Sequence, residues 1–227
     1  MAQTQRAYLP AAGKSWLLPL YDVTTKLIGG DQARRALFGH VDLKPGDRVL
    51  EIGCGTGSLT ILLKQRYPQI EIVGLDPDPE ALTRARQKAK RAAASIQFIQ
   101  GFSDALEYPA GFFDHVFSSF MFHHLENAQK EETLREVCRV LKPGAHLHLL
   151  DFTGPEAAGD SSVSRWLHSH HRLNDNSESR IITMMTDAGF QDVKVAGRQT
   201  VLFGFGHVAY YLASASNSAS GTEVSQT

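Results

Sequence analysis

Three glycines fall on alternate positions of the segment VLEIGCGTGSLT, residues 49–60. They are Gly53, Gly55 and Gly57, and they follow a short apolar run. Glycine lets a backbone turn tightly, and it lets a ligand approach the chain closely. A second apolar run ends in Asp76, whose carboxylate could accept hydrogen bonds from both hydroxyls of a ribose. This pattern predicts a site for a ligand that contains a nucleoside.

The residues around the loop discriminate among three such ligands. A loop for nucleoside triphosphates requires a lysine directly after its last glycine, and no lysine follows Gly57 closely. A dinucleotide loop has the spacing G-x-G-x-x-G, whereas this loop has G-x-G-x-G. Glu51 would repel a pyrophosphate, but it would attract the ammonium and sulfonium groups of S-adenosylmethionine. In an alternative interpretation Glu51 caps the amides of the loop itself, and both roles are compatible.

Two groups of histidines are candidates for acid–base chemistry. The first is the segment FHHL, in which His123 or His124 could take a proton from an acceptor near neutral pH. In the alternative, one of these rings packs structurally and the other faces solvent. The second group is His168, His170 and His171. Histidine is the commonest metal ligand, but no cysteine or carboxylate set completes a site here, so we expect no metal.

Alternating strands and helices must position these residues. Five apolar runs predict strands at residues 48–52, 70–76, 96–100, 113–119 and 146–152. Helices are predicted over 58–66, after Asp78 as N-cap, and along the apolar stripe of Leu134, Val137, Cys138 and Leu141. A helix over 179–188 and strands near 193–196 and 207–212 follow. The alternation indicates an α/β fold, a Rossmann-like doubly wound sheet of about seven mostly parallel strands with an antiparallel strand near the C-terminus.

The 227 residues are 42% hydrophobic, which suits one domain with a sizeable core. We expect an N-terminal helical segment over residues 1–44, with a helix that starts at Asp31 as N-cap. The α/β domain is expected over residues 45–213. Residues 214–227 are small and polar, and they are expected to form a disordered tail.

Five stretches of the chain resemble the class I S-adenosylmethionine-dependent methyltransferases. They are VLEIGCGTGSLT, VGLDPDPEAL, GFSDALEYP, FDHVFSSFMFHHL and LREVCRVLKPGAHLHLLDF, and they cover about residues 45–152 in the order of the family. The resemblance is greatest to the small-molecule branch that includes the ubiquinone/menaquinone-biosynthesis methyltransferases. Upstream, LYDVTTKLIGG resembles the N-terminal helix of the family more loosely.

The resemblance implies roles for individual residues. Gly53, Cys54, Gly55 and Gly57 would contact the methionyl part of S-adenosylmethionine, and Ser119 would line the same side. Asp76 would bind the ribose, while Pro77, Asp104 and Ala105 would lie at the adenine. Ser118 and Ser119 stand where catechol-type relatives place a magnesium-binding acid, which favours metal independence.

The acceptor site is implied less specifically. In this family the N-terminal segment covers the active site, and a substrate-lid insertion would span residues 153–178. The expected substrate-binding residues are Tyr21, Phe122, Trp166, His168 and His171.

Composition restricts the partners. The formal net charge is −1, which gives no electrostatic reason to expect nucleic acid. The basic run at residues 84–91 could form an RNA patch, but Leu82, Ala85 and Ala89 form an apolar face, which favours an ordinary solvated helix. The two cysteines lie far apart and no apolar window has the length of a membrane span. We therefore expect a cytoplasmic protein without membrane insertion, and its oligomeric state is not predicted.

These observations predict an S-adenosylmethionine-dependent methyltransferase that acts on a small-molecule acceptor by in-line displacement. Two alternatives stay open: an RNA or protein methyltransferase, and a catalytically silent S-adenosylmethionine-binding accessory protein. The near-zero charge weighs against the first, and the histidines together with the cofactor motifs weigh against the second. The acceptor atom is not predicted, because oxygen, nitrogen, carbon and sulfur acceptors all occur on this framework.

Overall fold

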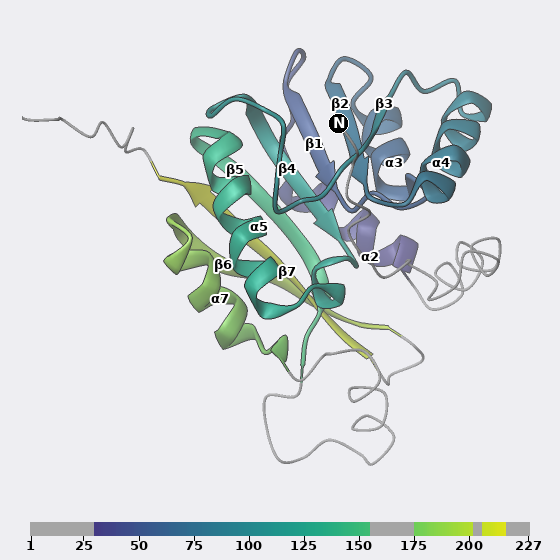
Figure 1. Cartoon of the computed structure of the whole chain (residues 1–227). Helices are drawn as coiled ribbons and strands as arrows, with labels where there is room; N and C mark the ends of the chain where they lie inside the picture. The colour runs from purple at the N-terminus through teal and green to yellow at the C-terminus, as the bar shows by residue number, and fades with distance from the viewer. Residues whose placement is uncertain (1–29, 155–174, 202–205, 217–227) are drawn as a thin grey trace, which may run out of the picture.

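The computed structural model describes residues 30–154, 175–201 and 206–216. Its centre is a seven-stranded sheet in the order β3-β2-β1-β4-β5-β7-β6 (Figure 1). The strands are β1 Arg48–Ile52, β2 Glu71–Asp76, β3 Gln97–Gln100, β4 Phe113–Ser119, β5 Leu141–Phe152, β6 Phe190–Val201 and β7 Gly206–Ala215. Strands β1 to β5 pair in parallel, whereas β7 runs antiparallel to both β5 and β6. The predicted Rossmann-like sheet with an antiparallel strand near the C-terminus is confirmed.

The strand order reverses between β1 and β4. From β1 the chain builds outward through β2 to β3, and it then returns to place β4 on the other side of β1. The loops after β1 and β4 therefore diverge at this point, and they leave a crevice beyond the carboxyl ends of the strands. The glycine loop follows β1 and the FHHL segment follows β4, so the reversal brings the two predicted sites together.

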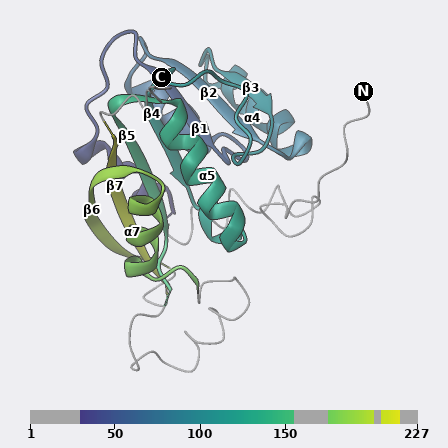
Figure 2. The same cartoon turned by 60° about the vertical axis from the view of Figure 1, so that its left-hand side comes forward.

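Helices cover the two faces of the sheet. They are α2 Gly30–Ala36, η2 Leu37–His40, α3 Ser58–Arg66, α4 Pro79–Arg91, η3 Phe122–His124, α5 Asn127–Val140 and α7 Glu178–Asp187. Helices α5 and α7 lie side by side on one face (Figures 1 and 2), where they enclose a core with Phe113, Val116 and Leu149. On the opposite face, α2 and α3 pack on a second core that includes Val49 and Phe117.

The helix after β2 forms where its signals predict. The Asp78 carboxylate accepts hydrogen bonds from the backbone amides of Glu80 and Ala81, and Pro79 occupies the first turn. Buried residues form one stripe of this helix: Ala81, Leu82, Ala85 and Ala89. Two members of the basic run are engaged within the fold, because Arg86 donates to the carbonyl of Phe98 and Lys88 donates to Thr56 and Ser58. The predicted apolar face of this helix is confirmed, whereas the absence of an RNA patch stays a prediction.

Several predicted boundaries are wrong. Asp31 is not an N-cap, because α2 begins at Gly30 and places Asp31 in its first turn. Strand β5 begins at Leu141 rather than His146, since residues 142–145 form an irregularity within the strand, where its register with β4 shifts.

The C-terminal strands are longer than predicted. Strand β6 covers Phe190–Val201, and β7 continues to Ala215, so the tail expected from residue 214 starts too early. Ser214 pairs with both His146 and Gln191, because β7 lies between two neighbouring strands. Pairing on both sides compensates for the small side chains that suggested disorder.

Only parts of the expected N-terminal segment and insertion belong to the described residues. Residues 30–44 of the segment and residues 153–154 and 175–178 of the insertion are described. The two ends of the insertion meet, because the Gly154 amide donates to the Asn176 carbonyl at 2.9 Å. Within the described part of the chain, no helix is long and apolar enough to cross a membrane.

Candidate active site

A cavity of about 480 Å³ lies at the strand-order reversal. This volume is within the range of small-molecule sites. Nine residues predicted to bind the cofactor or to catalyse line its wall: Glu51, Gly53, Cys54, Gly55, Asp76, Pro77, Asp104, Ser119 and His124. The fold therefore brings together residues that are up to 73 positions apart in the chain, from Glu51 to His124.

The glycine loop has no room for side chains at two positions. Gly53 has a φ of +63°, and an added Cβ would lie 2.1 Å from Cγ of Met121. Gly57 has a φ of +75° and precedes α3, where an added Cβ would lie 3.1 Å from the Cβ of Ala85. A side chain at position 57 would therefore press against α4, and Gly57 is not among the residues that line the cavity. Its contact with the cofactor stays a prediction.

Asp76 is held in place by backbone amides. Its carboxylate accepts hydrogen bonds from the amide of Gly55 at 2.8 Å and from the amide of Asp78 at 2.9 Å. Burial raises its pKa to about 6, although the two hydrogen bonds oppose the shift. Each carboxylate oxygen has a further lone pair, so Asp76 can still accept the hydroxyls of a ribose. Pro77 and Asp104 lie on the cavity wall with Asp76.

Glu51 is a buried carboxylate at the end of β1. It accepts hydrogen bonds from the hydroxyls of Thr60 and Ser119, the latter at 3.3 Å. Burial raises its pKa to about 7, while Thr60, Arg34 and Ser119 act in the opposite direction. Within the described residues its partners are these side chains and the first turn of α3, not the amides of the glycine loop. A ligand with positive charge would compensate for the burial of this carboxylate.

The sequence motifs did not predict Arg34, which lines the same cavity. Its side chain is 6% exposed, and its Nε donates to the Ser119 hydroxyl at 3.5 Å. It lies over the Phe120 ring, with 5.2 Å between Cζ and the ring centre. Nothing in the segment GDQARRALF marks this arginine, because its place depends on the packing of α2 against the end of β4.

The chain leaves β4 through a strained residue. Phe120 has a φ of +55°, a left-handed conformation that is unfavourable for a bulky side chain. Its amide donates to the Leu150 carbonyl at 2.9 Å, which helps to hold this conformation. The turn brings Met121 and His124 to the cavity wall. Strain of this kind is characteristic of functional sites.

The two neighbouring histidines occupy different places. His124 lines the cavity. His123 is buried and does not line it; its Nδ1 donates to Asp151 at 2.5 Å, and its backbone amide donates to the same carboxylate at 3.0 Å. Burial by itself would raise the pKa of Asp151, but His123 and the backbone amides lower it below its usual value. The two imidazole rings are adjacent, with 4.0 Å between their centres.

Two other predicted residues lie elsewhere. Phe122 was expected to bind substrate, but it is 1% exposed and belongs to the core beneath α5, because the short helix η3 turns its ring away from the cavity. Lys130 lies over this ring, with 5.5 Å between Nζ and the ring centre. Ala105 lies beside a neighbouring groove and not on the cavity wall. Tyr21, Trp166, His168 and His171 are outside the described residues.

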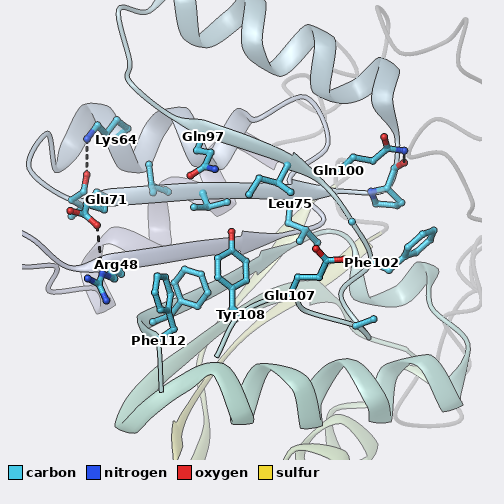
Figure 3. Close-up of a pocket in the computed structure, with 18 of the residues that line it drawn as sticks. Arg48, Lys64, Glu71, Leu75, Gln97, Gln100, Phe102, Glu107, Tyr108 and Phe112 are labelled. Carbon is cyan, nitrogen blue, oxygen red and sulfur yellow. Dashed lines mark hydrogen bonds and ion pairs between the residues drawn. The ribbon is translucent and has the colours of Figure 1, made fainter. Parts of the chain in front are cut away.

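The neighbouring groove has a volume of about 1570 Å³ (Figure 3). Leu75 and Gln97 from the sheet line one side, and Tyr108 and Phe112 from the β3–β4 connection line the other. The groove exists because this connection, unlike the others in the parallel part of the described sheet, contains no helix. Leu75, Pro77 and Phe102 border both the groove and the cavity, so the two meet at the predicted adenine end.

Comparisons with known proteins agree with this geometry. A methyltransferase domain model matches residues 49–144. The demethylmenaquinone methyltransferase of Deinococcus radiodurans is 38% identical over 157 residues, which are 68% of this chain and 64% of that protein. The chain therefore spans less than two thirds of the length of that relative. The enzyme of the same name from Thermus thermophilus is 37% identical, over 66% of this chain and 69% of its own length.

Solved structures share the fold. The YcgJ protein of Bacillus subtilis has a TM-score of 0.69 at 17% identity, over 82% of this chain and 99% of its own. The phosphoethanolamine N-methyltransferase 2 of Haemonchus contortus, solved with S-adenosyl-L-methionine, has a TM-score of 0.76 at 16% identity. The match covers 90% of this chain and 58% of that one. The family follows from the relatives with higher identity, among which UbiE of Yersinia enterocolitica is 30% identical over 69% of its length. The chain belongs to the class I methyltransferases of the ubiquinone/menaquinone type, and its cofactor is S-adenosylmethionine.

Proposed function

We propose that this protein transfers a methyl group from S-adenosylmethionine to a small hydroxyaromatic acceptor of the quinol class. The observation that carries the proposal is a single cavity in which the glycine loop, Asp76 and Glu51 meet His124. Relatives at 37 and 38% identity are named demethylmenaquinone methyltransferases, which supports a ring system with hydroxyl groups as the acceptor.

The residues of the cavity suit the cofactor. Asp76 would accept from the ribose hydroxyls, and Pro77 and Asp104 would lie at the adenine. The glycine loop with Cys54 and Ser119 would hold the methionyl end, where Glu51 faces positive charge. When bound, S-adenosylmethionine supplies a methyl group that is already activated by a sulfonium. The protein therefore has to align the acceptor, exclude water and accept a proton.

We assign the proton acceptor to His124, because its ring is on the cavity wall. A hydroxyl of the acceptor would give its proton to an imidazole nitrogen of His124. Loss of that proton would increase the electron density of the aromatic ring. The oxygen or a ring carbon would then take the methyl group as the bond between this group and the sulfonium breaks. A methylated ring carbon would pass its hydrogen as a proton to the ring oxygen, which restores the aromatic ring. His123 is a positioning residue in this proposal. Asp151 holds both its amide and its Nδ1, which fixes η3 and thereby the direction of the His124 ring.

An acceptor screen tests the proposal. Release of S-adenosylhomocysteine would be measured with hydroquinones, naphthols, amines and thiols as acceptors. We expect release with hydroquinones or naphthols, and a His124→Ala variant should lose more activity at low pH than at high pH. Activity only with amines or thiols would contradict the acceptor class. Cofactor binding without release for any acceptor would favour the silent accessory protein.

The remaining expectations on partners stay predictions. A cytoplasmic location and the absence of a nucleic-acid partner rest on composition alone. A gel-shift measurement with transfer RNA at moderate salt tests the second of them.

A further inference from the structure

The cavity contains a buried cation next to a buried carboxylate. Arg34 from α2 and Glu51 from β1 both line it, and their side chains are bridged by the Ser119 hydroxyl. Nε of Arg34 lies 3.5 Å from the hydroxyl oxygen, and this hydroxyl donates to Oε1 of Glu51 at 3.3 Å. Helix α2, β1 and β4 therefore place a positive and a negative side chain on the same cavity wall, with only the Ser119 hydroxyl between them.

The hydrogen-bonding capacity of Arg34 is only partly used. Nη1 donates to Asp31 at 3.3 Å, and Nε makes the long contact with Ser119. Within residues 30–154, 175–201 and 206–216, no acceptor is found for Nη2. The Phe120 ring lies against the guanidinium and restricts its orientation. A cation with 6% exposure and a spare donor group would gain from an anionic ligand.

The methionyl end of the cofactor has the matching charges. An amino-acid end carries a carboxylate and an ammonium on the same carbon atom, so its two charges are as close together as those of the protein wall. A guanidinium binds a carboxylate through parallel hydrogen bonds, whereas a carboxylate such as Glu51 accepts from an ammonium. Reversal of the amino-acid end would place like charges together.

We propose that Arg34 binds the carboxylate of the methionyl group while Glu51 faces its ammonium, so that the enzyme selects a methyl donor with a complete amino-acid end. This inference rests on the proposed function, because it places the cofactor in this cavity. It adds a binding residue from the N-terminal segment, and it predicts that the enzyme discriminates against a donor that lacks the carboxylate.

Calorimetry with two ligands tests the proposal. The ligands are S-adenosylmethionine and decarboxylated S-adenosylmethionine, which keeps the amine and the sulfonium but has no carboxylate. We expect the wild-type protein to prefer the complete cofactor by about ten- to a hundredfold, the range for a charge-assisted hydrogen bond. In Arg34→Met, the affinity for the complete cofactor should fall by this factor while the affinity for the decarboxylated compound changes little. Arg34→Lys should keep part of the preference, because it retains the charge but not the planar fork.

Arg35→Met is the matched control. Arg35 is the next residue of α2 and is exposed, so its removal should leave both affinities unchanged. Thermal unfolding of each variant checks that α2 remains packed. An equal preference in wild type and Arg34→Met would overturn the inference while leaving the cofactor assignment intact. No binding of S-adenosylmethionine by the wild-type protein would instead contradict the proposed function itself.

Discussion

Glu51 couples the stability of the cofactor-free protein to pH. The change Glu51→Gln removes the charge and retains the shape and most of the hydrogen-bonding capacity, because an amide can accept from Thr60 and also pair with Ser119. The variant should be more stable than the wild-type protein at neutral and alkaline pH. It should also bind S-adenosylmethionine more weakly, since the cofactor ammonium loses its charged partner.

The size of the stability effect follows from the pKa of Glu51. Folding raises this pKa from 4.5 to about 7, mainly through burial. Below pH 4.5 the carboxyl group is protonated in both states, so it contributes no difference. As pH rises through the interval from 4.5 to 7, the unfolded chain ionises first and the wild-type protein loses stability. The full shift corresponds to about 3 kcal/mol, of which roughly 2 to 3 kcal/mol develops between pH 5 and pH 8.

Thermal unfolding without cofactor, at a series of pH values, measures this effect. The difference in Tm between Glu51→Gln and wild type should grow by roughly 5 to 10 °C from pH 5 to pH 8 for a domain of this size. Glu71→Gln is the control, because the Glu71 side chain on the neighbouring strand is 73% exposed. Its Tm difference from wild type should not depend on pH in this way. A pH-independent difference for Glu51→Gln would refute the assignment of a buried, destabilising charge at this position.

Three further predictions concern the same domain. Asp76→Ala should weaken S-adenosylmethionine binding by about tenfold or more in calorimetry, because two ribose hydroxyls lose a charged acceptor; unchanged affinity would exclude the ribose role. Gly53→Ala should abolish measurable binding, since the new Cβ would collide with Met121 and the residue has a φ of +63°; a variant with normal affinity would show that the loop is not rigid. Burial, together with neighbouring histidines, lowers the pKa of His148 well below 6.5, so stability should fall by up to about 1.4 kcal/mol per unit as pH decreases below 6.5. In His148→Gln, the free energy of unfolding measured by denaturant titration should depend less steeply on pH below 6.5. An equally steep loss of stability in the variant would contradict the reasoning.

Local sequence signals were sufficient to predict most strands of the parallel part of the sheet. The strand over Phe113–Ser119 and the helix over Ser58–Arg66 have the predicted bounds, because apolar periodicity and turn residues act over a few positions. The lengths of β6 and β7 were underestimated, because local signals do not include the partner strands that extend them. The pairing of Ser214 depends on two partner strands, and no feature of its own neighbourhood encodes them.

The sequence by itself determined the donor. The spacing of the glycines, with acids at Glu51 and Asp76, predicts a ligand that contains a nucleoside and carries positive charge. This prediction needs only the type and position of each residue. Tertiary structure decided which neighbours share that cavity. The left-handed turn at Phe120 places His124 on the cavity wall and leaves His123 with Asp151, although the two histidines are adjacent and identical in type. Arg34 lines the cavity because α2 packs against the end of β4. Such long-range contacts leave no local pattern in the sequence.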